Sequence, residues 1–414
     1  MLLTTIQAKR AALRGALLAC RERTLALTSD LQAADCDQQP HPDFSPVGWH
    51  LGHIALTEAY WILERLAGQP PLYPQYRRLF AADGLPKTER QHLPPLDRLL
   101  QCLAVVRSRV LDYLMTAPLP EQERLWYWLL QHESQHNETI TFLLQLRRWQ
   151  PWGEGWQMGQ RPSPSPREDM VTLAAGSIQL GSEAIAAQDH ERPLYRIDLP
   201  AYALDRFPVT CQDFQAFINA GGYQRREFWS EAGWRWLQEQ PVDRPLYWLA
   251  APEWANHPVC GVSWYEAAAY AHFVEKRLPT EAEWAQAARW AGDRACSRAY
   301  PWGDTPPSAT RCNYDGLVGH TTPVDAYPAG QSASGCWDLL GNVWEWTATP
   351  FAGYPGFVPY PYRGYSQAYF DKRHYVLRGG SWATRPWSLR ASSRNWYEPG
   401  VRQILAGFRC ARSL

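Results

Sequence analysis

Residues 131–139 read QHESQHNET and lie within 121–149, a stretch with the features of one long helix. Two acidic residues follow Pro120 at its start, where the helix dipole favours negative charge. His132 and His136 are four residues apart, so their imidazoles lie on one face of that helix and can reach a single ion. The stretch therefore predicts a helix that carries two candidate metal ligands.

The rest of the N-terminal part is predicted to form a helical bundle around this helix. Apolar residues in 2–30 recur at intervals of three and four, as they do on one face of a helix. Two further helices are expected over 45–66 and 94–116, and Gly or Pro residues follow each of them. The first of these contains GWHLGHIA, which adds His50 and His53 as possible ligands. Bundle interiors are common places for metal sites, and spacing alone does not choose between these two histidines.

Three neutral imidazoles from two neighbouring helices suit a divalent ion that keeps open positions for substrates. Without a third histidine, a pair spaced like His132 and His136 is more often an ordinary part of a core or surface. The segment HESQH also has the spacing of the zinc-protease motif HExxH, with Glu133 where that motif has its general base. A zinc hydrolase is therefore an alternative to an enzyme that uses another metal.

The Pro- and Ser-rich stretch RPSPSPRED, residues 161–169, predicts a linker between two domains. After it, short strand-like runs stand between Gly, Pro and Asn turns, and amphipathic helices are expected over 210–219 and 263–275. The 22 Trp and 21 Tyr residues are typical of a domain that holds irregular backbone together with large side chains. The expected divisions are a helical bundle over 1–155, a linker over 156–169 and a mixed α+β domain over 170–414.

The composition favours a cytoplasmic enzyme that acts on small molecules. Lys+Arg and Asp+Glu number 41 each, so the formal net charge is zero and nothing draws the chain to nucleic acid or to an anionic membrane. No stretch is long enough to cross a bilayer, and no secretory signal is expected. The nine cysteines are scattered without a CxxC pair, which predicts reduced, mostly buried thiols and disfavours a cysteine-rich zinc site.

Six short motifs follow residue 170. They are GSIQLG (176–181), RLPTEAEW (277–284), YPWGD (300–304), GNVWEW (341–346), RGGSW (378–382) and AGFRCAR (406–412). In this order and spacing they resemble the formylglycine-generating-enzyme (sulfatase-modifying) domain, a variant of the C-type lectin fold. The N-terminal half resembles a DinB-type four-helix bundle. The fusion of the two resembles the ergothioneine-type sulfoxide synthases and the selenoneine synthases over almost the whole chain.

That resemblance implies a non-haem iron enzyme. Such enzymes use Fe(II), with O2 as co-substrate, to join sulfur or selenium to an imidazole carbon of hercynine, a histidine derivative. The motif positions that hold iron in the family correspond here to His53, His132 and His136. His50 falls where the sulfoxide synthases commonly have an acid, which implies a place beside a ligand and not on the metal.

The resemblance also implies roles for residues of both halves. Gln135, within the metal motif, corresponds to a residue that contacts the imidazole substrate. The family's active-site tyrosine lies between GNVWEW and RGGSW, where YPYRGY offers Tyr362, with Tyr365 as its neighbour. The segment RNWYEP matches the part that holds the trimethylammonium and carboxylate ends of hercynine. The residues expected there are Trp396, Tyr397 and Glu398.

The chain departs from the sulfoxide synthases in the loop after the second helix. There those enzymes clamp the carboxylates of γ-glutamylcysteine with arginines. This loop offers Lys87 and Arg90, which we expect to bind the donor, without the family's arginine pattern. A selenosugar donor is therefore preferred, which makes the chain a selenoneine synthase. The alternative is a sulfoxide synthase that joins hercynine to cysteine or γ-glutamylcysteine.

Two other functions are weighed against this one. Formylglycine generation relies on paired reactive cysteines near the chain end, whereas Cys410 is the only cysteine after Cys336. A non-enzymatic binding module is a second possibility, because lectin-like domains often only bind. The histidine cluster of the bundle argues against it.

Overall fold

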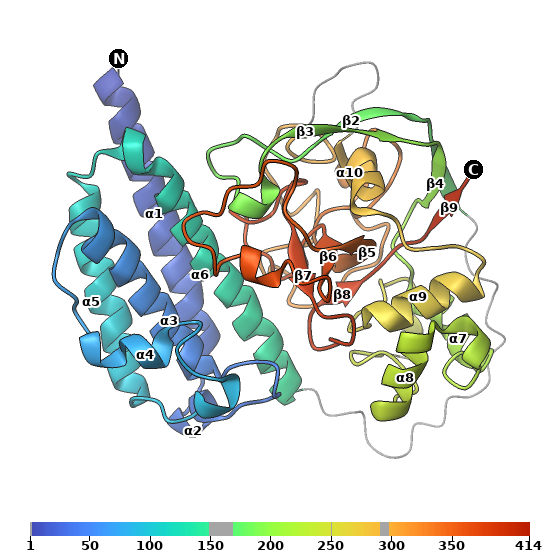
Figure 1. The fold of residues 1–414 in the computed structure, drawn as a ribbon, viewed down its shortest axis with the longest axis horizontal. Coiled ribbons are helices and arrows are strands. Elements are labelled where there is room, and N and C mark those ends of the chain that lie inside the picture. The colour runs from blue at the N-terminus through green and yellow to red at the C-terminus, as the bar shows by residue number, and fades with distance from the viewer. Residues whose placement is uncertain (1, 149–168, 250, 290–297) are drawn as a thin grey trace. The chain divides into compact units, whose positions relative to one another are not determined.

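The computed structural model describes residues 2–148, 169–249, 251–289 and 298–414. Its internal contacts divide the chain into two compact units, residues 1–150 and 151–414, drawn in blue to teal and in green to red in Figure 1. The predicted linker over 156–169 lies outside the described residues, apart from Asp169.

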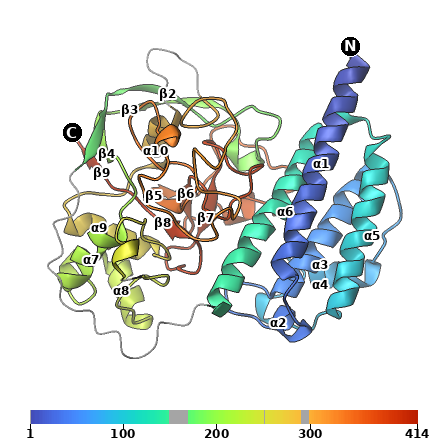
Figure 2. The same ribbon diagram turned by 180° about the vertical axis from the view of Figure 1, so that it is seen from behind.

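The first unit is built on four long helices, as the sequence predicts. They are α1 (Leu2–Thr28), α3 (Val47–Glu58), α5 (Leu96–Leu114) and α6 (Leu119–Arg148). Helix α1 packs on α6, and α3 packs on both α5 and α6, so the four lie side by side in Figures 1 and 2. The connections contain short elements, namely α2 (Ala33–Asp37), η2 (Pro74–Tyr76), α4 (Arg77–Phe80) and η3 (Lys87–Glu89). The expected four-helix bundle is therefore confirmed.

The helix predicted over 45–66 consists of two parts. Its α-helical part begins at Val47, and from Ala59 it continues as a π-helix, η1 (Ala59–Leu66). The hydrogen bond from Ala67 N to Ile62 O, 2.9 Å long, joins residues five apart at its end. The predicted helix is therefore present through Leu66, but its type changes at Ala59, which apolar periodicity does not show over so short a stretch.

The described residues of the second unit form three small β-sheets. A three-stranded sheet has the order β1-β4-β9, β2 pairs with β3, and a four-stranded sheet has the order β7-β6-β5-β8. All neighbours are antiparallel except β5 and β8. The strands are β1 (Met170–Leu173), β2 (Gly176–Leu180), β3 (Tyr195–Leu199), β4 (Tyr202–Asp205), β5 (Trp344–Pro350), β6 (Tyr375–Arg378), β7 (Asn395–Tyr397), β8 (Ala406–Gly407) and β9 (Ala411–Ser413).

Helices and irregular segments surround these sheets, which confirms a mixed α+β unit. The α-helices are α7 (Cys211–Asn219), α8 (Glu231–Glu239), α9 (Trp264–Phe273) and α10 (Glu281–Arg289). Helix α9 starts with a capping box, in which Ser263 Oγ accepts from Glu266 N and Glu266 Oε2 accepts from Ser263 N. The 3₁₀ turns are η4 (Asp189–Glu191), η5 (Arg226–Phe228), η6 (Pro252–Trp254), η7 (Pro328–Gly330) and η8 (Gln367–Tyr369).

Motifs that are far apart in the sequence meet in the core of the second unit. The carboxylate of Glu345, from GNVWEW, accepts from Trp284 Nε1 at 2.7 Å and from Arg409 Nε at 2.7 Å. Arg378, from RGGSW, forms an ion pair of 3.1 Å with Glu281, from RLPTEAEW. All five side chains are buried, and buried charges are tolerated when they are paired in this way. These motif residues therefore hold the unit together.

All eight cysteines in the described part of the chain are buried free thiols, and Cys296 lies outside that part. In the same described residues, no helix combines the length and the apolar character that a membrane crossing requires.

Candidate metal centre

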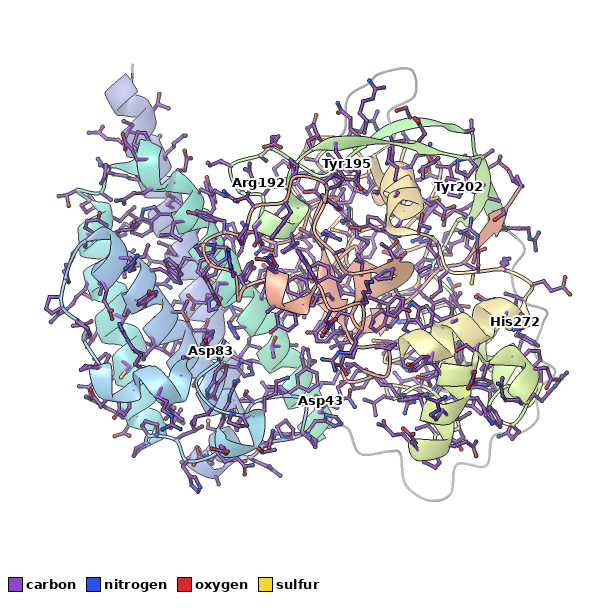
Figure 3. The ribbon with its side chains drawn as sticks, viewed as in Figure 1. Asp43, Asp83, Arg192, Tyr195, Tyr202 and His272 are labelled. Atoms are coloured by element: carbon purple, nitrogen blue, oxygen red, sulfur yellow. The ribbon has the colours of Figure 1, made fainter. Side chains whose placement is uncertain are left out.

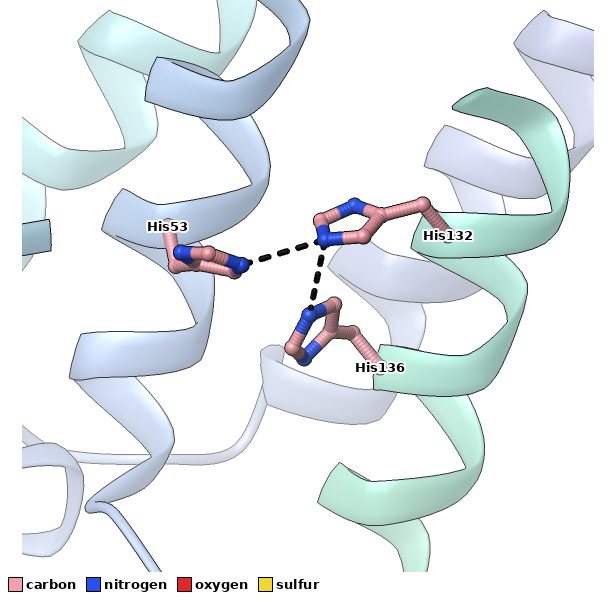
Figure 4. A group of neighbouring side chains, drawn as sticks. All are labelled: His53, His132 and His136. Carbon is pink, nitrogen blue, oxygen red and sulfur yellow. Dashed lines mark hydrogen bonds between the residues drawn. The ribbon is translucent and has the colours of Figure 1, made fainter. Parts of the chain in front are cut away.

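Three histidines converge between helices α3 and α6. His53 lies on α3, and His132 and His136 lie one turn apart on α6 (Figure 4). His132 Nε2 is 3.1 Å from His53 Nε2 and 3.2 Å from His136 Nε2. One ligand nitrogen from each ring lies within 4.8 Å of the other two, which is close enough for a single ion to bind all three.

Hydrogen bonding at the far side of the His53 ring directs its lone pair into the cluster. His53 Nδ1 is 2.6 Å from the carbonyl oxygen of Phe80, so Nδ1 carries the proton and donates it. The Nε2 of His53 is then an acceptor only. This is the arrangement in which histidines bind metals, with the outer nitrogen held by a carbonyl or a carboxylate.

The three nitrogens cannot satisfy one another by hydrogen bonds alone. A bond between His132 and His53 requires a proton on His132 Nε2, because the Nε2 of His53 has none. With that proton in place, His132 Nε2 has no lone pair left to accept from His136. At most one of the two short contacts is therefore a hydrogen bond, whereas a cation between the rings would satisfy all three nitrogens. The donor set thus fits a metal ion.

His50 lies next to His136 and not among the three converging nitrogens. Its Nδ1 is 2.8 Å from Nδ1 of His136. If His136 offers Nε2 to a metal, its Nδ1 carries the proton and donates to Nδ1 of His50. An imidazole thus stands where a carboxylate or carbonyl usually orients a metal-binding histidine.

Burial keeps these imidazoles neutral. It lowers the pKa of His53 to about 4 and that of His50 to about 3. The same loss of hydration lowers the pKa values of His132 and His136 well below the ordinary 6.5. Neutral imidazoles have the lone pairs that a metal ligand needs, so the cluster does not have to lose protons before it binds an ion near neutral pH.

Two of the three histidines also rest on an indole one helical turn earlier. The ring of His53 stacks on Trp49 with centroids 4.6 Å apart, and His132 stacks on Trp128 at 5.2 Å. A four-residue step brings the two side chains together on a helix face. The sequence repeats the pattern Trp-x-x-x-His on both helices, and this spacing alone indicates that each indole lies beside its histidine.

Glu133 does not face the cluster in the way a general base would. Its Oε1 accepts from Arg21 Nε at 2.7 Å and from Thr24 Oγ1 at 2.7 Å, and its Oε2 accepts from Arg107. The charges of Arg21 and Arg107 outweigh burial, which alone would raise the pKa of Glu133, and hold that pKa well below its usual range. Both carboxylate oxygens are thus engaged with α1 and α5, which removes the support for a zinc hydrolase.

Gln135 precedes His136 on α6 and is half-buried.

Lys87 and Arg90, the two residues predicted to bind the donor, lie between α4 and α5 and differ in their surroundings. Lys87 is exposed, and its Nζ donates to the carbonyl of Asp43 at 2.6 Å. Arg90 is buried and donates hydrogen bonds within its own loop and to Ser45, two residues before α3.

The guanidinium of Arg90 is engaged on several sides. It donates from Nε to the carbonyl of Leu85 at 2.9 Å, from Nη2 to that of Ala82, and from Nη1 to Ser45 Oγ at 3.0 Å. It also lies 4.2 Å above the ring of Trp49, the indole that supports His53. These contacts favour a structural role for Arg90 over the binding of a donor carboxylate.

The second unit contains the other predicted site residues. Tyr365 is buried and Tyr362 is half-buried, with ring centroids 6.3 Å apart. Trp396, on β7, stacks on Phe351 at 4.2 Å with the rings only 7° from parallel. Tyr397 on the same strand is half-buried. The structure thus brings Trp396 into an aromatic cluster and keeps the two tyrosines of one loop together.

Glu398, the acidic candidate of this segment, is exposed, and Arg373 Nη2 lies 3.6 Å from its carboxylate. An exposed pair at this distance is weak, so the carboxylate is open to other cations. Sequence reasoning missed the turn Asp189–Glu191, whose three side chains are buried. The turn contacts Trp396 and both ends of residues 360–366, the loop that contains Tyr362. Its only signal was the occurrence of three titratable residues in succession.

Comparison with known proteins gives a match to both halves of the chain. The model of the sulfatase-modifying factor enzyme 1-like domain matches residues 157–414, and that of the DinB superfamily matches residues 16–140. The chain is 38% identical to the hercynine oxygenase of Mycolicibacterium thermoresistibile, over 97% of this chain and 95% of that protein. It is 39% identical to the hercynine oxygenase of Mycobacterium tuberculosis, over 95% and 97%, and 36% identical to that of Mycolicibacterium smegmatis, over 97% and 99%.

The fold and the histidine cluster define a class of enzyme in which a DinB-type bundle is fused to a sulfatase-modifying domain. Within that class, the chain is similar to the three hercynine oxygenases over nearly the full length of each. The chain belongs to the hercynine oxygenase family. The resemblance drawn from the six motifs is therefore confirmed.

Proposed function

We propose that this enzyme uses Fe(II) and O2 to form a carbon–chalcogen bond at C2 of the hercynine imidazole. The observation that carries the proposal is the convergence of three Nε2 atoms, 3.1 Å and 3.2 Å apart, which a single cation would bridge. Its relatives carry the name hercynine oxygenase, which supports both the substrate and the use of oxygen.

His53, His132 and His136 are the proposed iron ligands. Bound Fe(II) would supply the one-electron chemistry with O2 that an aromatic imidazole carbon requires. Three neutral protein ligands would leave positions for substrates, as open non-haem iron sites do. The indoles behind His53 and His132 and the imidazole of His50 hold the rings in the orientation that ligation needs.

Further residues are proposed to handle hercynine, each on the resemblance to the family. Gln135, next to a ligand, orients the imidazole. Trp396 offers an indole ring to the trimethylammonium group by cation–π attraction. Tyr397 lies next to it on β7, and the exposed carboxylate of Glu398 adds negative charge for the same cation. Tyr362 donates a proton from its phenol, with Tyr365 buried as its neighbour.

For the donor, we propose a selenosugar in preference to γ-glutamylcysteine. A peptide donor brings carboxylates, which arginine forks bind well. The guanidinium of Arg90 is occupied by two backbone carbonyls, Ser45 and the face of Trp49. Lys87 is exposed in this loop, and its ammonium is a point charge and not a fork that matches a carboxylate. Formation of the sulfur product from cysteine or γ-glutamylcysteine is the alternative.

We place the enzyme in the cytoplasm. The support is chemical, because eight buried cysteines remain free thiols in the described residues, as in proteins of reducing compartments.

One assay tests the proposal. The protein is purified without oxygen and mixed with Fe(II), hercynine and either a selenosugar or γ-glutamylcysteine before O2 is admitted. We expect O2 consumption and, by mass spectrometry, a hercynine–selenium product with the selenosugar only. A product with γ-glutamylcysteine instead would overturn the donor assignment. The absence of O2 consumption with every donor would overturn the oxygenase itself, and zinc-loaded protein is the matched control.

A further inference from the structure

Three successive side chains of the second unit are completely buried although all of them can carry charge. They form the turn η4, Asp189, His190 and Glu191, each with 0% exposure. Arg192, labelled in Figure 3, follows the turn directly. Ionisable side chains are rarely buried to this degree unless they have specific partners, and these three contact two parts of the unit, residues 360–366 and the segment that leads into β7.

Asp189 closes the loop that carries the two tyrosines. Its Oδ2 accepts from Tyr360 N at 3.1 Å and from Ser366 Oγ at 2.7 Å. Its Oδ1 accepts from the backbone N–H of His190 at 2.7 Å. Residues 360 and 366 flank Tyr362 and Tyr365, so a single carboxylate binds both ends of the loop, across more than 170 residues of sequence.

His190 and Glu191 contact the segment that leads into β7. The His190 ring meets the Trp396 ring edge to face, with centroids 5.0 Å apart, and the His190 carbonyl accepts from Arg394 Nη1 at 2.6 Å. Glu191 accepts from Arg390 Nε at 2.9 Å and from Ser392 Oγ at 2.7 Å. The turn that closes the tyrosine loop therefore also holds the strand that presents Trp396.

We propose that the turn Asp189–Glu191 is a positioning element for the substrate site, with Asp189 as the positioning residue for the loop 360–366. The inference rests on the proposed function for the roles of Tyr362 and Trp396, and on contacts alone for the closure of the loop. Its physical basis is that a catalytic side chain acts efficiently only when neighbouring residues hold it in the productive orientation. A loop on the surface would otherwise leave the phenol of Tyr362 in many orientations.

The loop contains a trypsin cleavage site whose cutting rate measures how often the loop opens. Arg363 is exposed between the two anchored ends, so trypsin can cut the Arg363–Gly364 bond when the loop opens. Lys372 and Arg373 are exposed just outside the loop and serve as internal reference sites. When opening is fast relative to cleavage, the cleavage rate measures the population of the open loop.

The experiment compares limited trypsin digestion of the full-length wild-type chain with that of two variants. Asp189→Asn removes the charge that accepts both hydrogen bonds, and Ser366→Ala removes one donor without a change in the turn. Loss of a hydrogen bond to a charged acceptor predicts about tenfold or greater acceleration of cleavage at Arg363. Cleavage at Lys372 and Arg373 should not change. Asp243→Asn is the matched control, because its partner Arg244 is neither in the loop nor a reference site.

Turnover provides the second readout. In an active wild-type enzyme we expect Asp189→Asn to lower kcat about tenfold while KM for the donor stays within twofold. Unchanged cleavage at Arg363 in both variants would overturn the closure of the loop. Faster cleavage with an unchanged kcat would overturn the positioning role. The digestion needs neither iron nor hercynine, so an inactive wild-type protein would count against the proposed function and leave the closure measurable.

Discussion

Replacement of Glu133 by Gln tests whether this residue supports the bundle or acts in the chemistry. Its carboxylate forms ion pairs with Arg21 and Arg107, and Glu58 pairs with the same two arginines at 2.7 Å and 2.6 Å. The four side chains carry two charges of each sign, and none is more than 7% exposed. Together they join α1, α3, α5 and α6, and Glu133 directly follows His132 on α6.

The substitution leaves two buried guanidinium groups with one carboxylate. Removal of one partner from a buried ion pair costs roughly 3–5 kcal/mol, because the remaining charge is no longer compensated. Domains are stable by only about 5–15 kcal/mol, so the expected loss is a large part of the stability of the bundle. Because about 1.4 kcal/mol corresponds to a factor of ten, this loss raises the population of unfolded bundle at least about 100-fold.

Hydrogen exchange of peptides from α1 and α6 measures this population in the bundle alone, which matters because the chain has two units. Glu123→Gln is the control on the same helix, since Glu123 pairs with Lys9, whose side chain is 47% exposed. That change should cost less than about 1 kcal/mol. A Glu133→Gln variant that loses turnover while its exchange stays at the wild-type rate would refute the structural role and restore the general base.

Further predictions concern the metal site, the donor loop and pH. His136→Ala should lower the iron content below one third of the wild-type value by metal analysis; an unchanged stoichiometry would remove the metal hypothesis. His50→Ala should weaken Co(II) binding about 10- to 100-fold in a spectroscopic titration, whereas His50→Gln, which keeps an acceptor for His136, should recover much of it; equal affinities would contradict the orienting role. Arg90→Ala should destabilise the bundle in thermal unfolding and change KM for the donor less than twofold, and a large rise in that KM would show that Arg90 binds the donor. Burial alone would raise the pKa of Glu191, but the charge of Arg390 outweighs it and lowers that pKa from 4.5 to about 2. The resulting stability is complete above pH 4.5 and is lost as the pH falls towards 2, so the unfolding temperature of the second unit should fall less steeply between pH 5 and 3 in Glu191→Gln than in the wild type.

The helical half was largely predictable because its signals are local. The four-residue step between His132 and His136 sets their common face, and the Ser263–Glu266 capping box of the second unit depends on only four residues. The type of helix beyond Glu58 was not predictable, because a π-helix leaves no distinct apolar period over eight residues. The six motifs were sufficient for the sulfatase-modifying domain, since their order and spacing are specific as a set, and its fusion to a DinB-type bundle indicated the family.

The sequence by itself determined which residue types could form the site, namely two histidines on one helix face and others on a second helix. Only the tertiary structure decided that Nε2 of His53 enters the cluster while His50 contacts the outer nitrogen of His136. It also decided that Glu133 and Arg90 are engaged elsewhere and that Asp189 closes a loop more than 170 residues away. The physical reason is that these outcomes depend on how helices are rotated and which distant segments are packed together. Local periodicity carries no information about either.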